Sequence, residues 1–257
     1  SCPPPESILS DLLQQRLALL SAPDVLPLLR ELRRGIDPDR ATPSLSLLGP
    51  GAGFEGSSTT HLSVVDAAGN AVALTYTLNG SFGNGVVVTG AGFLLNNEMD
   101  DFTAKPGAPN AYGLRQGSQN AIAPGRRPLS SMTPTLVFRL DGTPLLATGS
   151  PGGSRIITTV LQVLLNRLVH GLNLASSVAA PRIHSQLWPD QISMEQGISP
   201  DTIRLLERQG HKVVLAPSMG SANSVEVRAD PQADESGRDS IKTYGYADQR
   251  RLDSAAM

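Results

Sequence analysis

Residues 56–66 read Gly-Ser-Ser-Thr-Thr-His-Leu-Ser-Val-Val-Asp, and the chain changes character inside this stretch. Up to this point, residues 35–58 are rich in Pro, Gly and Ser, which is typical of a linker or an exposed loop. From Thr59 onward, hydroxyl, β-branched and small apolar residues predominate. The junction therefore divides the chain into a first part, residues 1–58, and a second part, residues 59–257.

The second part predicts hairpins first and packed helices later. Residues 61–65 alternate in polarity, and a turn at residues 66–70 leads to the β-formers of residues 71–77, so a hairpin is predicted. The other predicted elements are strands at 86–88 and 93–95, a hairpin at 135–140 and 145–148, helices at 154–169, 178–180 and 200–209, and strands at 213–215, 224–228 and 241–244. In the first part, leucines at helical spacing predict helices at residues 8–20 and 24–34. This order indicates an α+β fold built of layers, not a doubly wound parallel sheet.

Composition excludes some partner classes. The formal net charge of the 257 residues is −2, which argues against strong electrostatic attraction to nucleic acid or an anionic membrane. The basic runs at residues 30–34 and 250–251 are interpreted as solvated helix or loop ends. No segment approaches the roughly 18 apolar residues of a membrane span. Cys2 is the one cysteine, so no intrachain disulfide is possible, which fits a reducing compartment and a periplasmic protein equally.

Several weak motifs carry no function. Residues 51–56 match the dinucleotide fingerprint literally, but a loop precedes them and a strand follows, so a flexible loop is the better interpretation. The four histidines show no metal spacing, so no metal site is expected. His61 lies close to the hydroxyl cluster, but because adjacent strand residues point to opposite faces, we interpret it as structural.

Thr59 is the candidate nucleophile. A threonine hydroxyl is a poor nucleophile unless a base lies within hydrogen-bond reach, and an N-terminal threonine can use its own α-amine, whose pKa lies near 8. That chemistry requires cleavage of the Ser58–Thr59 bond, for which a pliable loop ending there is suited. Taken alone, small hydroxyl residues at a loop–strand junction are far more often only that.

Five ordered stretches resemble the gamma-glutamyltransferase family, also called gamma-glutamyltranspeptidases or glutathione hydrolases. They are Thr-Thr-His-Leu-Ser-Val-Val-Asp at 59–66, Tyr-Thr-Leu-Asn at 76–79, Leu-Asn-Asn-Glu-Met-Asp-Asp-Phe at 95–102, Arg-Pro-Leu-Ser-Ser-Met at 127–132 and Gly-Ser-Pro-Gly-Gly-Ser at 149–154. The resemblance runs from Thr59 to about Asp253, the family's small subunit. It implies an N-terminal-nucleophile hydrolase-like αββα sandwich, incomplete without the large subunit. Residues 1–58 would be the large subunit's end, with helices and a flexible processing loop, and residues 59–257 the catalytic small-subunit domain.

The resemblance also implies roles at the reaction centre. Thr59 would first cleave the Ser58–Thr59 bond and then take up the gamma-glutamyl group, and Thr77 would orient the freed Thr59. Gly152 and Gly153 would present backbone N–H groups to the oxyanion, which suits residues that open a predicted helix. Without the resemblance, a strand threonine and a strand-to-helix turn would be the plain interpretations.

Further residues would hold the donor's zwitterionic head group. Asn79, Glu98 and Asp101 match residues that receive the α-ammonium, and two nearby carboxylates suit a buried cation. The hydroxyls of Ser130 and Ser131 would hold the α-carboxylate, and Tyr112 would close a lid by bonding Asn79. The plain alternatives are an ordinary turn at 130–131 and a solvated acidic loop at 98–101.

The resemblance implies an enzyme that moves the gamma-glutamyl group of glutathione or related amides to water, an amino acid or a peptide. It would need no metal or organic cofactor, would pair with a large-subunit chain or segment that supplies a carboxylate-binding arginine, and would be periplasmic or extracellular. One alternative is an unprocessed or truncated, non-catalytic light-chain-like protein. Another is a β-lactam side-chain acylase, against which Glu98, Asp101, Ser130 and Ser131 argue because they suit an amino-acid head group.

Overall fold

A two-stranded hairpin begins directly after Thr59. The computed structural model describes residues 27, 30, 33–43, 59–108, 117–187, 189–229, 241–251 and 255–256. Strand β1 (Thr60–Val65) pairs antiparallel with β2 (Ala71–Tyr76), with Thr60 opposite Tyr76. The Asp66 carboxylate accepts the backbone N–H of Ala68 and Asn70, which fixes the turn between the strands. The first predicted hairpin is confirmed.

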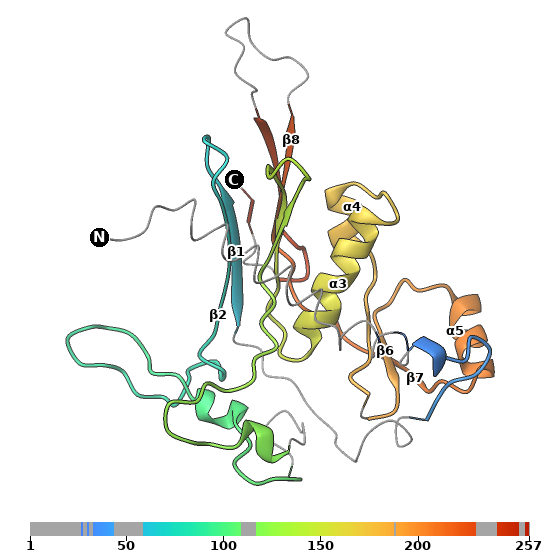
Figure 1. Cartoon of the computed structure of the whole chain (residues 1–257), viewed down its shortest axis with the longest axis horizontal. Coiled ribbons are helices and arrows are strands. Elements are labelled where there is room, and N and C mark those ends of the chain that lie inside the picture. Colours follow the sequence, from blue (N-terminus) through green and yellow to red (C-terminus); the bar gives the residue numbers. More distant parts are fainter. Residues whose placement is uncertain are drawn as a thin grey trace, which may run out of the picture.

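The central sheet has four antiparallel strands in the order β3-β4-β8-β9. Their bounds are Thr135–Phe138 for β3, Pro144–Thr148 for β4, Ser224–Ala229 for β8 and Ile241–Tyr246 for β9. The predicted hairpin at residues 135–148 is confirmed, with Asp141 accepting the N–H of Thr143 in its turn. The β1–β2 hairpin packs on one face of this sheet (Figure 1).

Two helices cover the opposite face of the central sheet (Figure 1). They are α3 (Arg155–Leu168) and α4 (Leu174–Ala179). Asn173 caps the N-terminus of α4, because its side chain accepts the N–H of Ser176. α4 therefore begins four residues before the predicted range 178–180 and ends at Ala179. The core between helices and sheet consists of Leu146, Val163, Leu174, Val178 and Ala222.

A third, smaller sheet lies beyond the helices, at the right of Figure 1. It contains β5 (Ile183–His184), β6 (Ile192–Met194) and β7 (Val213–Leu215), and β6 pairs parallel with β7. The crossover between β6 and β7 is α5 (Pro200–Arg208), which the Ser199 side chain caps at the N-terminus. The prediction included β7 and α5 but missed β5 and β6.

Hairpin, sheet and helices thus form successive layers, and the predicted α+β class is confirmed.

The predicted strands at residues 86–88 and 93–95 are not present. These two segments are connected instead by a single isolated bridge between Val87 and Leu94. Two short 3-10 helices follow, η2 (Glu98–Asp101) and η3 (Ser118–Asn120). Ala41, in the predicted linker, donates its N–H to the carbonyl of Gln209 at 2.7 Å. In the described part of the chain, no helix has the length and apolar character that crossing a membrane requires.

Candidate active site around Thr59

The hydroxyl of Thr59 is held by that of Thr77. The register of β1 and β2 places these residues opposite each other, one step beyond the pair Thr60–Tyr76. Thr59 is 7% exposed, and its Oγ1 donates to Thr77 Oγ1 at 3.1 Å. Thr77 Oγ1 also accepts the backbone N–H of Asn79 at 2.8 Å. Two neighbours therefore fix the Thr77 hydroxyl, and it in turn orients the Thr59 side chain.

His61 lies on the same side of β1 as Thr59, because residues two apart share a face. The reason given above for its structural role was therefore wrong. Its ring nitrogens bond Thr75 Oγ1 at 2.9 Å and Ser63 Oγ at 3.0 Å. Burial lowers the pKa of His61 from 6.5 to about 4, so the ring is neutral at physiological pH. These bonds support the structural interpretation.

The His61 ring also packs against Gly149, at the start of the loop that carries Gly152 and Gly153. A Cβ on Gly149 would lie 2.3 Å from His61 Cε1, so only glycine fits beside the ring. Gly152 and Gly153 have φ angles of 134° and 54° and lie immediately before α3, as predicted. Their carbonyls accept the first backbone bonds of that helix, from Arg155 and Ile156. The positive end of the α3 dipole therefore lies at these two glycines.

Asn97 connects the Thr77–Asn79 segment to the acidic helix η2. Its side-chain Oδ1 accepts the N–H of Gly80 at 2.8 Å, its carbonyl accepts Asn79 Nδ2 at 3.2 Å, and its own N–H donates to the carbonyl of Leu78. Asn79 is buried and adopts a left-handed φ of 67°, which asparagine tolerates better than most residues. These bonds hold the segment of Asn79 next to the start of η2, where Glu98 lies. Asn97 was not predicted as a site residue.

The carboxyls of Glu98 and Asp101 form an interacting pair. Burial raises the pKa of Glu98 from 4.5 to about 7, and the hydrogen bond to Asp101 and its negative charge add to this rise. The pKa of Asp101 is also raised, chiefly by burial. Among the described residues, Glu98 Oε1 is buried and has no hydrogen-bond partner. Two carboxyls that resist ionising together, one with an unsatisfied oxygen, form a site suited to a cation.

Asn120 links this pair to the segment that contains Ser130 and Ser131. Its Nδ2 donates to the carbonyl of Asp101 at 2.6 Å, and its Oδ1 accepts the N–H of Leu129 at 2.9 Å. Ser130 is exposed, and its Oγ accepts the N–H of Met132 at 3.2 Å. The two serines therefore lie on an irregular segment that Asn120 tethers to η2. Asn120 is a further residue that sequence reasoning missed.

Two predicted residues, Ser58 and Tyr112, lie outside the described residues, as do the predicted helix at 8–20 and the glycine-rich stretch at 51–56. The described residues contain no group of His, Cys, Asp and Glu arranged to hold a metal. A cavity of about 500 Å³ is present elsewhere, lined by residues such as Glu195, Tyr246 and Arg250 and by none of the predicted site residues.

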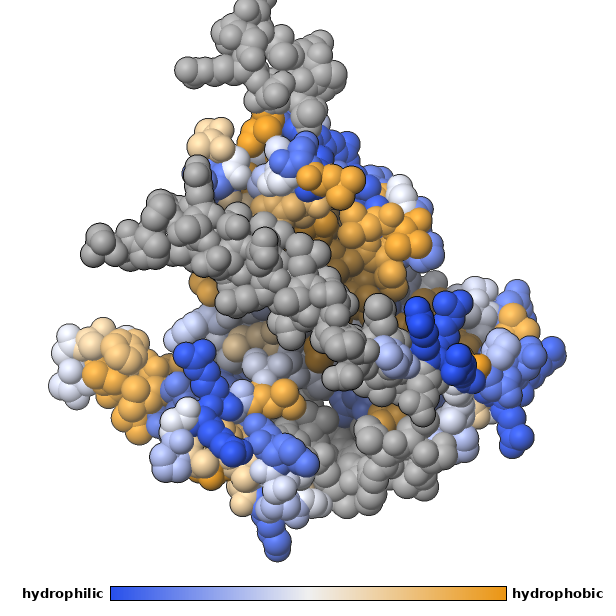
Figure 2. All heavy atoms as spheres, in the orientation of Figure 1, coloured by the Kyte–Doolittle hydropathy of each residue, from blue (hydrophilic) through white to orange (hydrophobic). Residues whose placement is uncertain are grey.

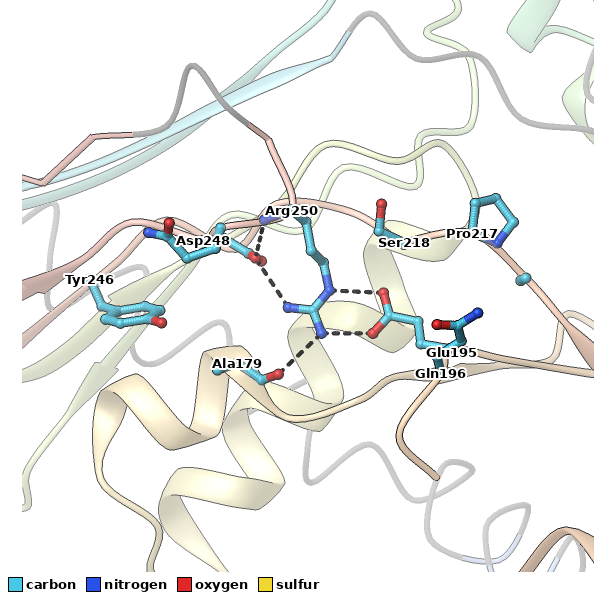
Figure 3. A pocket seen from close by; sticks show the side chains of 10 residues that line it. Ala179, Glu195, Gln196, Pro217, Ser218, Tyr246, Asp248 and Arg250 are labelled. Carbon is cyan, nitrogen blue, oxygen red and sulfur yellow. Dashed lines mark hydrogen bonds and ion pairs between the residues drawn. The ribbon is translucent and has the colours of Figure 1, made fainter. Parts of the chain in front are cut away.

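A buried ion network lies beside that cavity (Figure 3). Arg182 and Asp248 pair at 2.6 Å with side chains 2% and 1% exposed. Arg250 donates from Nε and Nη2 to the two carboxylate oxygens of Glu195, at 2.8 and 2.7 Å. The interpretation of residues 250–251 as solvated ends was therefore wrong, because Arg250 is fixed by buried carboxylates and Arg251 donates to the carbonyl of Thr59 at 3.0 Å.

Comparisons with known proteins bear on the family to which this chain belongs. The gamma-glutamyltranspeptidase family model matches residues 24–257. The glutathione hydrolase proenzyme of Escherichia coli is 53% identical over 220 residues, which are 85% of this chain and 36% of that protein. The chain thus spans about a third of the length of this curated relative.

Two solved structures resemble the chain closely. A threonine-to-alanine mutant of Helicobacter pylori gamma-glutamyltranspeptidase superimposes with a TM-score of 0.69 at 47% identity, covering 75% of this chain and all of that one. An acivicin-inhibited gamma-glutamyltranspeptidase, whose C-terminus is critical for autoprocessing and catalysis, gives a TM-score of 0.69 at 46% identity over 75% of this chain and 99% of that one. The layered fold is therefore that of these N-terminal-nucleophile hydrolases. By sequence and by structure, this chain belongs to the gamma-glutamyltranspeptidase family.

Proposed function

We propose that residues 59–257 of this chain form the catalytic small-subunit region of a gamma-glutamyl hydrolase and transferase. Its donors would be gamma-glutamyl amides such as glutathione, and its acceptors water, amino acids or peptides. The observation that carries the proposal is the 3.1 Å hydrogen bond from Thr59 Oγ1 to Thr77 Oγ1 at the start of β1. It holds a buried hydroxyl at the residue whose backbone nitrogen would become the α-amine after cleavage.

The proposed chemistry has two stages. Thr59 Oγ1 first attacks the carbonyl carbon of Ser58, and the Ser58–Thr59 C–N bond breaks to give an ester and a free Thr59 α-amine. Water then hydrolyses the ester, which releases the Ser58 carboxylate and restores the Thr59 hydroxyl. In turnover, that amine takes the hydroxyl proton as Oγ attacks the donor's γ-carbonyl, and the proton passes to the leaving amine. An acceptor then releases the glutamyl ester. Backbone N–H groups of Gly152 and Gly153, before the N-terminus of α3, would stabilise the oxyanion at each attack.

The acidic pair would bind the donor's α-ammonium. Glu98 Oε1 is buried without a partner, and the ammonium would satisfy it while allowing both Glu98 and Asp101 to ionise. Asn79 would contribute its side-chain oxygen, while its Nδ2 donates to the carbonyl of Asn97. Ser130 and Ser131 would bind the α-carboxylate, and Tyr112 would close over the donor. A simple diacid arm would leave the acidic pair without its cation, which disfavours the β-lactam acylase.

A further chain segment would complete the protein. The outward face of β1–β2 is apolar and about half exposed, with Leu62, Val64, Val72 and Leu74 between 44% and 51% exposed. Apolar side chains also gather on the loop between β2 and η2, at the left of Figure 2, where Phe82, Val87 and Phe93 are exposed. We expect a large-subunit segment to cover these surfaces and to supply the carboxylate-binding arginine. Residues 1–58 would be that segment's end. Family membership also leads us to expect a periplasmic or extracellular protein in which the C-terminal residues matter for cleavage.

Incubation of the purified chain tests the proposal, first alone and then with a supplied large subunit. We expect cleavage into two fragments, the second beginning at Thr59 by mass spectrometry, and hydrolysis of a gamma-glutamyl anilide in preference to a glutaryl anilide. Thr59→Ala should abolish both, and Thr59→Ser should retain both at reduced rates. A chain that stays intact in both settings would support the non-catalytic light-chain alternative, and preference for the glutaryl substrate would support the acylase.

A further inference from the structure

Arg251 bonds the backbone of Thr59 from outside the β1–β2 hairpin. Its Nη1 donates to the Thr59 carbonyl at 3.0 Å, from a position 192 residues later in the chain. The contact is independent of the Thr59 side chain and of the predicted substrate residues. It therefore bears on how the nucleophile's backbone is held, which Thr77 alone does not determine.

The position of Arg251 follows from the buried ion network. After β9, Ala247 and Asp248 are buried, and Asp248 Oδ2 accepts from both Arg182 Nη2 and the backbone N–H of Ala222. Figure 3 shows Arg250 extended between Asp248 and Glu195, with its guanidinium also donating to the carbonyl of Ala179, the last residue of α4. The backbone around residues 248–250 is thus fixed on several sides. The next side chain, Arg251, starts from an anchored point and reaches Thr59.

The same contact places a positive charge near the future α-amine. The nitrogen and the carbonyl oxygen of one residue lie no more than about 4 Å apart through their connecting bonds. With the 3.0 Å bond, Nη1 of Arg251 therefore lies within roughly 7 Å of the Thr59 nitrogen. A cation at this range disfavours a second positive charge, so it favours the unprotonated amine that the proposed reaction requires.

Other charged groups near this end of β1 have smaller or opposite effects. On β1, His61 is neutral and engaged by Thr75 and Ser63. On the loop joined to Asn79, Glu98 and Asp101 are negative when ionised and would favour a protonated amine. On the C-terminal segment, Asp248 and Arg250 are paired within the buried network. Arg251 is the cation among these groups that contacts Thr59 itself.

We propose that Arg251 is a positioning residue for the nucleophile, which fixes the Thr59 carbonyl and, after cleavage, keeps the Thr59 α-amine available as a base. This rests on the proposed function, since it presumes that Thr59 is released. The role is assigned to the guanidinium and its charge. Arg251→Gln removes the charge but keeps an N–H donor, Arg251→Met removes both, and Arg251→Lys retains the charge. Arg251→Met serves as a second neutral variant if the glutamine variant folds poorly.

The test is the pH profile of kcat/KM for gamma-glutamyl anilide hydrolysis, measured on the full chain assembled as for wild type, with the cleaved fraction quantified. For Arg251→Gln we expect the acidic limb to move up by about half a pH unit, with kcat/KM about threefold lower below pH 7. Arg251→Lys should keep the wild-type limb. Arg204→Gln, which alters an exposed arginine on α5, is the matched control and should change neither.

The outcomes separate the two proposals. If wild type neither splits before Thr59 nor turns over, both the proposed function and the role of Arg251 are overturned. If wild type is active and the neutral variants keep its acidic limb and rate, only the role of Arg251 is overturned. A uniform rate loss without movement of the limb would also count against it, because loss of folded enzyme has that signature.

Discussion

The acidic pair at η2 should exchange a bound proton for the donor's ammonium. With a pKa of about 7, Glu98 is about half protonated at pH 7 in the unliganded chain, roughly nine tenths at pH 6 and about one tenth at pH 8. A bound ammonium replaces that proton, because it stabilises the ionised form of both carboxyls. Binding should therefore release about 0.9 proton at pH 6, 0.5 at pH 7 and 0.1 at pH 8.

The same linkage sets the affinity. Because only the ionised pair accepts the cation, the apparent Kd should weaken about tenfold from pH 8 to pH 6. The sign follows from the raised pKa of Glu98, since protons compete with the ligand below about pH 7 and not above it. The titration belongs to the Glu98–Asp101 pair as a whole, so the release is assigned to both carboxyls together.

Calorimetry with L-glutamate measures both quantities. Titrations in buffers of different ionisation enthalpy give the protons released, and a Thr59→Ala background keeps the α-amine from forming and contributing. Glu98→Gln should weaken binding at pH 8 and abolish the release and its pH dependence. Glu207→Gln, which removes an exposed carboxylate on α5, is the matched control and should leave the release close to that of the parent. Equal release in the Glu98→Gln variant, or none at pH 6 in the parent, would refute the assignment.

Two more predictions concern the framework of the site. Arg182→Met should lower the free energy of unfolding by about 3–5 kcal/mol, because it removes the ion partner of the buried Asp248 Oδ2 and leaves only Arg250, on Oδ1, to balance that carboxylate. Arg204→Gln, at an ion pair whose side chains are 63% and 78% exposed, should change it by less than about 0.5 kcal/mol. Urea unfolding measures both, and a loss below 1 kcal/mol for Arg182→Met would contradict the first. Thr77→Val should slow the release of a fragment beginning at Thr59 by about 10- to 100-fold, because the Thr59 hydroxyl loses its oriented partner. Thr77→Ser should stay within a few-fold of wild type when the fragment is quantified by mass spectrometry over time, and equal rates for the two variants would exclude an orienting role.

The sequence predicted those elements whose information is local. The β1–β2 hairpin has an Asp-Ala-Ala-Gly-Asn turn, and α3 has a long apolar period after two glycines, so neighbouring residues specify both. β5 and β6 have two and three residues, too few for any period to show. What defines them is pairing with each other and, for β6, with β7 across α5, and such pairing leaves no local pattern.

The ion network was missed for a related reason. Arg250 and Glu195 are 55 residues apart and each is ordinary in its own surroundings, where charged residues are usually solvated. Only tertiary packing brings them together in a buried place. The predicted site residues, by contrast, came from stretches of resemblance, and the structure joins them through Asn97 and Asn120, whose role as connectors depends on contacts between loops.

The alternating pattern of β1 alone could not show which of its two faces turns toward the core. Alternation indicates a strand but does not say which face turns inward, and hydropathy would bury Leu62 and Val64. The structure instead turns His61 and Ser63 toward the central sheet and leaves the apolar side chains about half exposed. The inward face continues from Thr59, so it must be polar to seat the hydroxyl network of the nucleophile. The outward face then has apolar area to bury, worth about 1 kcal/mol for each half-exposed Leu or Val. β1 thus takes part in two interfaces. Because the polar hydroxyl network occupies its inward face, its apolar side chains lie on the outward face, where we expect the large-subunit segment to cover them.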